Sequence, residues 1–98
     1  MIEEHLYIVT YDIADDKRWR AIFKLMHGYG EWLQLSVFQC RLTRMRHVEL
    51  MQGLANEMSM TDDHVMVIDI GPVEAVKPRV QSLGKRGFER IERVPVIV

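Results

Sequence analysis

One carboxylate stands where protein chemistry often takes place, at the end of a buried strand. The run from His5 to Tyr11 is rich in β-branched and aromatic residues and is apolar at both alternating sets of positions, which predicts a central strand. Asp12 follows it directly and is therefore a candidate functional residue. Asp15 and Asp16 could extend an acidic site, but carboxylates just before a helix usually satisfy its free amide groups and its dipole. We interpret them as helix caps.

The histidines and the cysteine do not form a recognisable metal site. His5, His27, His47 and His64 lie far apart in the sequence and show no metal-ligand spacing with Cys40. A single cysteine cannot form an internal disulfide, and Cys40 falls within a predicted strand. We therefore expect no zinc, and we interpret Cys40 as a small apolar core residue.

Basic residues gather near Asp12 although the whole chain is not basic. The formal net charge is -1, which argues against a globally basic nucleic-acid binder but leaves local patches open. Arg18, Arg20 and Lys24 are predicted on the exposed side of the helix after Asp12, where they could bind backbone phosphates or simply form a solvated face. Further cations follow in clusters at Arg41, Arg44 and Arg46, at Lys77 and Arg79, and at Lys85, Arg86, Arg90 and Arg93.

Two amphipathic helices are expected to cover the sheet. The first has a helical stripe, stopped by Gly28 and Gly30, and the second is capped by Thr43 and runs to about Met58. The stripe of the first consists of Trp19, Ile22, Phe23, Met26 and Tyr29, and that of the second of Val48, Met51, Leu54, Ala55 and Met58.

The remaining segments predict strands and one weak helix. Residues 31–42 alternate as a strand, and 64–70 form a nearly continuous apolar run typical of a strand inside a sheet. Residues 73–83 contain Pro78 and predict only a short broken helix, and a final strand is expected from Phe88. This order indicates an α+β split-βαβ fold, which is ferredoxin-like (βαββαβ) if the segment 31–42 bends near Leu35 or Ser36.

The chain length fits one domain with little core to spare. Its 98 residues would bury roughly two thirds of the unfolded-chain surface, so we expect a single domain over residues 1–98 and favour oligomerisation. The apolar ending Val94-Pro95-Val96-Ile97-Val98 would be costly in water and is expected to pair with something, such as another subunit. We see no leader and no membrane span, so a cytoplasmic location is expected.

Three segments of the first half, in this order, resemble the CRISPR-associated protein two family. They are Tyr11-Asp12-Ile13-Ala14-Asp15-Asp16-Lys17-Arg18, then Gly28-Tyr29-Gly30, then Gln34-Leu35-Ser36-Val37-Phe38-Gln39-Cys40. The match covers about the first 42 residues and is looser after Met58. Each segment alone is weakly specific, and their ordered combination in a chain of this length carries the resemblance.

The resemblance implies a ferredoxin-like homodimer acting in spacer acquisition. Residues 88–98 would form an additional carboxy-terminal strand or tail that joins the partner subunit, and the dimer would bind the integrase, CRISPR-associated protein one. The family's metal-binding Asp falls on Asp12, which implies a Mg²⁺ site, because Mg²⁺ needs only one or two carboxylates beside waters and a phosphate oxygen. Arg18, Arg20, Lys24, Arg41 and Arg44 are the candidate contacts to prespacer DNA or to RNA.

Three functions remain open from the sequence. The chain could be a non-catalytic adaptor that spaces two integrase subunits and tracks a prespacer duplex through its phosphates. It could instead, or also, be a magnesium-dependent endonuclease that uses Asp12 from both protomers on RNA or DNA. The alternative outside this family is a ferredoxin-like toxin-type nuclease or a small regulatory dimer, for which the first-half motif would be coincidence.

Overall fold

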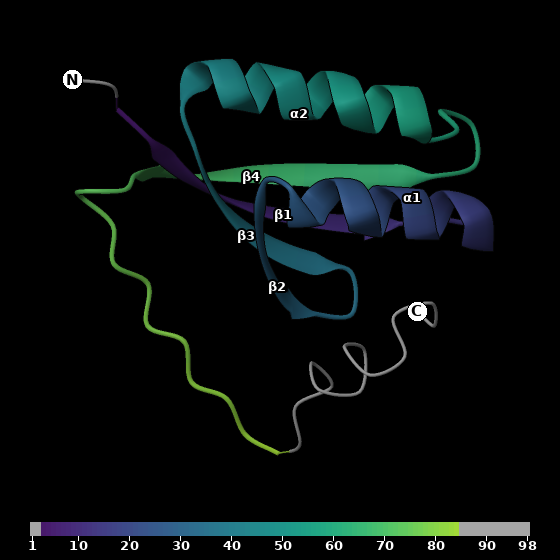
Figure 1. The fold of residues 1–98 in the computed structure, drawn as a ribbon. Coiled ribbons are helices and arrows are strands. Elements are labelled where there is room, and N and C mark those ends of the chain that lie inside the picture. The colour runs from purple at the N-terminus through teal and green to yellow at the C-terminus, as the bar shows by residue number, and fades with distance from the viewer. Residues whose placement is uncertain (1–2, 85–98) are drawn as a thin grey trace.

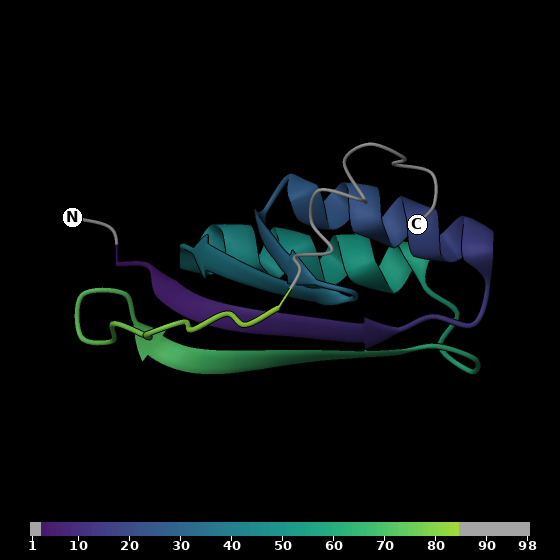
Figure 2. The same cartoon turned by 90° about the horizontal axis from the view of Figure 1, so that it is seen from below.

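Two helices cover one face of a four-stranded antiparallel sheet. The computed structural model describes residues 3–84. Its elements are β1 (His5–Asp12), α1 (Asp16–His27), β2 (Gly30–Gln34), β3 (Val37–Leu42), α2 (Arg44–Glu57) and β4 (His64–Pro72). The strand order is β2-β3-β1-β4, with every neighbouring pair antiparallel. Both helices lie on the same side of the sheet (Figures 1 and 2). The α+β, ferredoxin-like βαββαβ prediction is confirmed.

The core lies between the helices and the two central strands. Alternation along β1 directs Tyr7, Val9 and Tyr11 toward the helices, and β3 adds Phe38 and Cys40, both without exposed surface. Phe23 of α1 packs edge-on against Phe38 at a ring distance of 5.7 Å and also contacts the rings of Trp19 and Trp32. Burial of Cys40, which confirms its interpretation as a core residue, raises the pKa of its thiol to about 11.

Helix α1 begins and ends as its sequence predicts. Asp15 is the N-cap, and its carboxylate accepts a hydrogen bond of 2.9 Å from the Arg18 amide. The helix ends at Gly28, whose amide donates to the Leu25 carbonyl. Ile22 and Met26 are fully buried, so the predicted apolar stripe of this helix is confirmed.

The segment 31–42 does bend at Leu35 and Ser36, which separate β2 from β3. Leu35 adopts a φ of 41°, a left-handed conformation that side chains disfavour. The Trp32 indole donates a 2.9 Å hydrogen bond to the Leu35 carbonyl, which holds the turn from inside. The predicted bend is therefore confirmed, and it makes the antiparallel β2–β3 pair.

Helix α2 buries only part of the stripe that we predicted. Leu54 is buried and Met58 packs against the core as predicted, but Val48, Met51 and Ala55 are exposed and Leu50 is buried instead. The helix carries two apolar stripes, so its periodicity does not say which stripe faces the sheet. Gly53 lies against Leu25 of α1, where an added Cβ would approach a Leu25 methyl to 3.2 Å. This close approach of α1 turns Leu50 and Leu54 inward.

Strand β4 and the segment after it also differ from the prediction. Within residues 3–84 β4 pairs only with β1 and lies at the sheet edge. It runs through Pro72, which pairs with His5, and has a bulge opposite Leu6 and Tyr7. Residues 73–75 form a turn and 76–84 have no helix, so the predicted broken helix is wrong. Instead the chain passes back over the sheet on the side away from the helices (Figure 2).

That side of the sheet, here called the open face, carries Ile8, Thr10, Gln39, Met66 and Ile68. Met66 and Ile68 are 48% and 41% exposed, although an apolar alternation of this kind normally faces a second layer. The predicted final strand from Phe88 and the tail 94–98 lie outside the described residues. Neither helix within 3–84 is long and apolar enough to cross a membrane.

Candidate functional site

Asp12 ends β1 with an exposed side chain, as the sequence predicts. Alternation along the strand places it on the open face with Ile8 and Thr10. Its partner across the sheet is His64, the first residue of β4 and also exposed. Neither side chain makes a hydrogen bond or ion pair with another residue between 3 and 84. The Asp12 carboxylate is therefore available to a ligand.

Tyr11 and Ser36 support this strand end from behind. The Tyr11 amide donates to the Ser36 carbonyl at 3.2 Å, and the Trp19 indole donates to the Ser36 hydroxyl at 3.1 Å. Burial of the Tyr11 ring beside Ser36 raises its pKa well above the ordinary value. Tyr11 thus packs in the core of the sheet, and Ser36 forms hydrogen bonds at the bend between β2 and β3.

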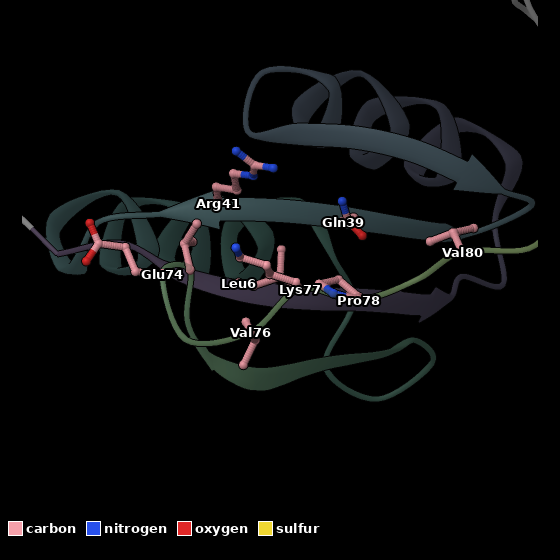
Figure 3. A pocket seen from close by; sticks show the side chains of 9 residues that line it. Leu6, Gln39, Arg41, Glu74, Val76, Lys77, Pro78 and Val80 are labelled. Carbon is pink, nitrogen blue, oxygen red and sulfur yellow. The ribbon is translucent and has the colours of Figure 1, made fainter.

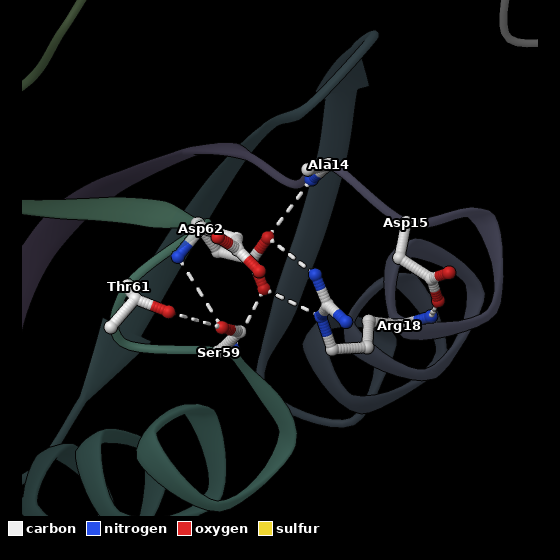
Figure 4. A network of polar contacts seen from close by, with 7 residues as sticks. Ala14, Asp15, Arg18, Ser59, Thr61 and Asp62 are labelled. Atoms are coloured by element: carbon white, nitrogen blue, oxygen red, sulfur yellow. Dashed lines mark hydrogen bonds and ion pairs between the residues drawn. The ribbon is translucent and has the colours of Figure 1, made fainter.

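Near Asp12, Asp63 accepts a group of hydrogen bonds that the sequence did not predict. Its buried carboxylate receives the Arg18 guanidinium in a two-bond ion pair, with Nε to Oδ2 at 2.7 Å and Nη2 to Oδ1 at 3.0 Å. The amides of Ser59 and Ala14 donate to the same carboxylate at 2.7 and 2.9 Å. We call these four residues the Asp63 clip (Figure 4). Arg18 and the two amides hold the pKa of Asp63 far below its usual range.

The basic residues proposed for nucleic acid lie on different surfaces of one chain. Arg20 and Lys24 are exposed on α1, where Lys17, three residues before Arg20, extends the same stripe. Arg18 leaves that stripe: its side chain is 30% exposed and paired with Asp63, so its predicted place on the exposed side is wrong. Arg44 is exposed at the start of α2.

Arg41 lies on the open face, beside a groove under the returning chain. The groove has a volume of about 520 Å³ and lies between β1, β3 and residues 73–80. Figure 3 shows Arg41 and Gln39 projecting from β3, while Lys77 and Pro78 cross above Leu6. Two cations, Arg41 and Lys77, and one carboxylate, Glu74, therefore line a groove whose other lining residues are mostly apolar.

Comparison with known proteins identifies the family. A family model described as "CRISPR associated protein Cas2" matches residues 5–77. The chain belongs to the Cas2 family. The resemblance inferred from the first 42 residues is thereby confirmed.

The Cas2 relatives are similar over nearly their whole length. A protein of Geobacter sulfurreducens named "CRISPR-associated endoribonuclease Cas2" is 54% identical over 97% of this chain and 99% of its own length. One from Rhodospirillum rubrum, "CRISPR-associated endoribonuclease Cas2 1", is 52% identical over 97% and 92%. The crystal structure of hypothetical protein TT1823 from Thermus thermophilus has a TM-score of 0.71 at 31% identity and covers 85% of this chain and 94% of that one.

Within residues 3–84, one Cas2 chain does not contain a complete metal centre. No three His, Cys, Asp or Glu side chains of this region are grouped so that they could hold a metal ion. Asp15 is occupied as a cap and Asp63 by four hydrogen bonds, which leaves Asp12 as the accessible carboxylate at the end of β1. A single carboxylate fits Mg²⁺ only where a phosphate or a second chain supplies more oxygen ligands.

Proposed function

We propose that this protein works as a homodimer in spacer acquisition, where it binds prespacer DNA through its backbone and bridges subunits of the integrase. The observation that carries this proposal is the open face beside Asp12. It leaves Met66 and Ile68 exposed in one chain, and β4 has a free edge within the described residues. A second copy would cover Met66 and Ile68 and would supply a strand to the free edge of β4.

The dimer would place its contacts symmetrically. In a twofold pair the same patch is used by both chains, so each residue of the open face approaches its own counterpart or a near neighbour. Residues 94–98 of each chain would then pair with the β4 edge of the partner. Asp12, which lies on the open face at the end of β1, would be brought toward the second Asp12.

The nucleic-acid contacts would go to phosphates. The exposed stripe Lys17, Arg20 and Lys24 on α1 presents three cations of the kind that bind backbone phosphates. Arg41 and Arg44 add charge on β3 and α2. Doubling these residues would give an extended basic track despite the net charge of -1, and affinity would fall steeply with salt.

A second function, magnesium-dependent cleavage of RNA or DNA, is favoured by the free carboxylate of Asp12. The endoribonuclease names of the relatives point the same way. Asp12 from each chain would hold Mg²⁺, which when bound supplies Lewis-acid polarisation of a phosphate oxygen and a more acidic water. The chain itself contributes position: the Ser36 contacts hold β1 in place, and the basic residues hold the phosphate backbone.

Spacer acquisition in cells separates the two functions. We would compare wild type with Asp12→Ala and Ile68→Lys. Asp62→Ala serves as a control, because Asp62 is an exposed acidic residue in the loop between α2 and β4. The adaptor function predicts that Ile68→Lys abolishes acquisition through loss of the dimer. If folded Ile68→Lys protein acquires spacers normally, the proposed dimer is wrong.

The Asp12→Ala result then assigns the metal. Loss of acquisition together with loss of Mg²⁺-dependent cleavage by purified protein would support chemistry at the paired carboxylates. Normal acquisition by a folded, dimeric Asp12→Ala variant would refute any need for that chemistry in acquisition and leave the adaptor role.

A further inference from the structure

Every acceptor position of the Asp63 carboxylate is occupied. Each of its two oxygens accepts two hydrogen bonds, Oδ1 from Ala14 and Arg18 and Oδ2 from Arg18 and Ser59, at 2.7 to 3.0 Å. An ionised carboxylate offers about four such positions. Its side chain has no exposed surface, while its neighbour Asp62 is exposed. Asp63 therefore cannot also act as a ligand to a metal ion without breaking this set.

The four donors come from three separate segments that meet around Asp12. Ser59 and Asp63 belong to the loop between α2 and β4, Ala14 to the loop between β1 and α1, and Arg18 to the first turns of α1. Ala14 follows Asp12 by two residues. On the other side, the strand partner of Asp12 is His64, which follows Asp63 directly. Figure 4 shows Ala14 and Arg18 joined to this network from one side and Ser59 from the other.

We propose that Asp63 is a positioning residue for Asp12. By holding the amide of Ala14 and the guanidinium of Arg18, it fixes the backbone on which Asp12 ends β1. Because Asp63 directly precedes His64, the first residue of β4, it also fixes the start of the neighbouring strand. The proposal rests on the function proposed for Asp12. Asp63 itself touches neither nucleic acid nor metal.

The same contacts assign a role to Arg18. Its guanidinium uses two nitrogens on Asp63, so the ion pair is locally neutral and most of the fork is turned inward. The exposed neighbours Arg20 and Lys24 have no such partner within residues 3–84. Arg18 therefore acts with Asp63 on the position of Asp12, and the phosphate contacts fall to the exposed stripe of α1.

The test compares two adjacent asparagine substitutions. Asp63→Asn keeps the shape of the side chain but turns an amide group toward N–H donors and removes the charge. Asp62→Asn removes the same charge from the exposed neighbour. Both are measured in metal-free protein at a temperature where circular dichroism shows them folded, and global unfolding is followed separately.

The first readout is hydrogen exchange of the Ala14 amide, together with the nuclear magnetic resonance order of the Asp12 backbone. Asp63→Asn should speed exchange at Ala14 by about 100-fold and lower the order at Asp12, while Asp62→Asn matches wild type. Arg18→Lys keeps the charge without the two-bond fork and should fall between them. Unchanged order at Asp12 in Asp63→Asn would overturn the proposal.

The second readout is Mn²⁺ binding, measured by electron paramagnetic resonance of the free ion without nucleic acid. We expect Asp12→Ala to abolish binding, Asp63→Asn to weaken it about 10-fold and Asp62→Asn to leave it unchanged. Wild-type affinity in Asp63→Asn would reduce the Asp63 clip to a purely structural contact and refute the proposal. If wild type itself does not bind Mn²⁺, the metal site of the proposed function fails, and the order at Asp12 alone decides whether Asp63 positions it.

Discussion

The two ends of α1 are both held by arginines, in opposite environments. At its start Arg18 meets Asp63, a carboxylate with no exposed surface. At its end Arg46 of α2 donates to the Gly28 carbonyl at 2.8 Å and lies over the Tyr29 ring at 4.2 Å, with its side chain 47% exposed. The first contact joins three segments around Asp12, and the second joins α2 to the end of α1.

Burial decides what each arginine can do. Removing Arg46 leaves a carbonyl and a ring that water can reach, because Gly28 is exposed. Removing one partner of the buried pair leaves a charge or several donors without a partner away from water, which proteins tolerate poorly. Of the two arginine contacts, the one beside Asp12 is thus the more costly to remove.

The largest effect on stability should come from a substitution at Gly30, just after the end of α1, and not from the loss of either arginine contact. A Cβ on Gly30 would collide with Cys40 Sγ and with the Gln39 carbonyl, both on the paired strand β3. Gly30→Ala should therefore lower the free energy of unfolding by about 3 kcal/mol in chemical denaturation. The matched control Gly28→Ala, at a helical φ of -80°, should change it by less than about 1 kcal/mol. Equal effects would contradict this packing.

Removing the arginine contact at one end of α1 should destabilise the protein more than removing the contact at the other end. We expect Asp63→Ala to lower Tm by about 10 °C and Arg46→Ala by about 3 °C, because only the first leaves buried groups without partners. Differential scanning fluorimetry of both variants measures the difference. Equal shifts, or a larger one for Arg46→Ala, would break the comparison.

Acid should reduce the contribution of Asp63 to the free energy of unfolding but not that of the Arg46 contact. The folded-state pKa of Asp63 is lowered, mainly by Arg18, so its contribution to stability is complete above the unfolded-state value of about 3.9 and declines as the pH falls below it. The difference in unfolding free energy between wild type and Asp63→Asn should thus be constant from pH 7 to pH 5 and shrink toward pH 3. Urea titrations across this range measure it, and a constant difference at pH 3 would contradict the assignment.

The smallest effect is expected at the bend that supports Asp12. Leu35 is 73% exposed at its φ of 41°, so its side chain gives up little packing. Leu35→Gly should relieve the left-handed strain and raise the free energy of unfolding by up to about 1 kcal/mol, less the entropy cost of glycine. Clear destabilisation in urea unfolding would show that the Leu35 side chain has a role that its exposure does not indicate.

The sequence predicted those features that depend on local pattern. The end of β1 at Asp12 and the Asp15 cap each follow from residue types within a few positions, and the structure agrees. The bend at Leu35 and Ser36 did not follow from local pattern, because residues 31–42 alternate as a single strand; only the ferredoxin-like fold required it. The fold followed because these elements occur in an order with few antiparallel solutions. The buried face of helix α2 was predicted only in part, because the helix has two apolar stripes and only its approach to Leu25 selects between them.

The Asp63 clip could not be predicted because it depends on burial. Asp62 and Asp63 are adjacent and identical in type, yet one is exposed and the other is enclosed by groups up to 49 residues away. Likewise the sequence predicts both Arg18 and Arg20 on the exposed side of the helix, and only the position of the α2–β4 loop turns Arg18 inward. The edge position of β4 within residues 3–84 was hidden for the same reason, since an apolar run also suits a strand that a second subunit covers.

Sedimentation equilibrium of the full chain tests most directly the central claim that this Cas2 family member works as a pair built on its open face. We predict that wild type has twice the mass of the chain at micromolar concentration, and that Ile68→Lys, which places a charge on that face, is monomeric with an unchanged circular dichroism spectrum. A control substitution on the exposed helix side, Lys24→Gln, should remain a dimer. Wild type that sediments as a monomer, or a folded Ile68→Lys variant that remains a dimer, would contradict the account.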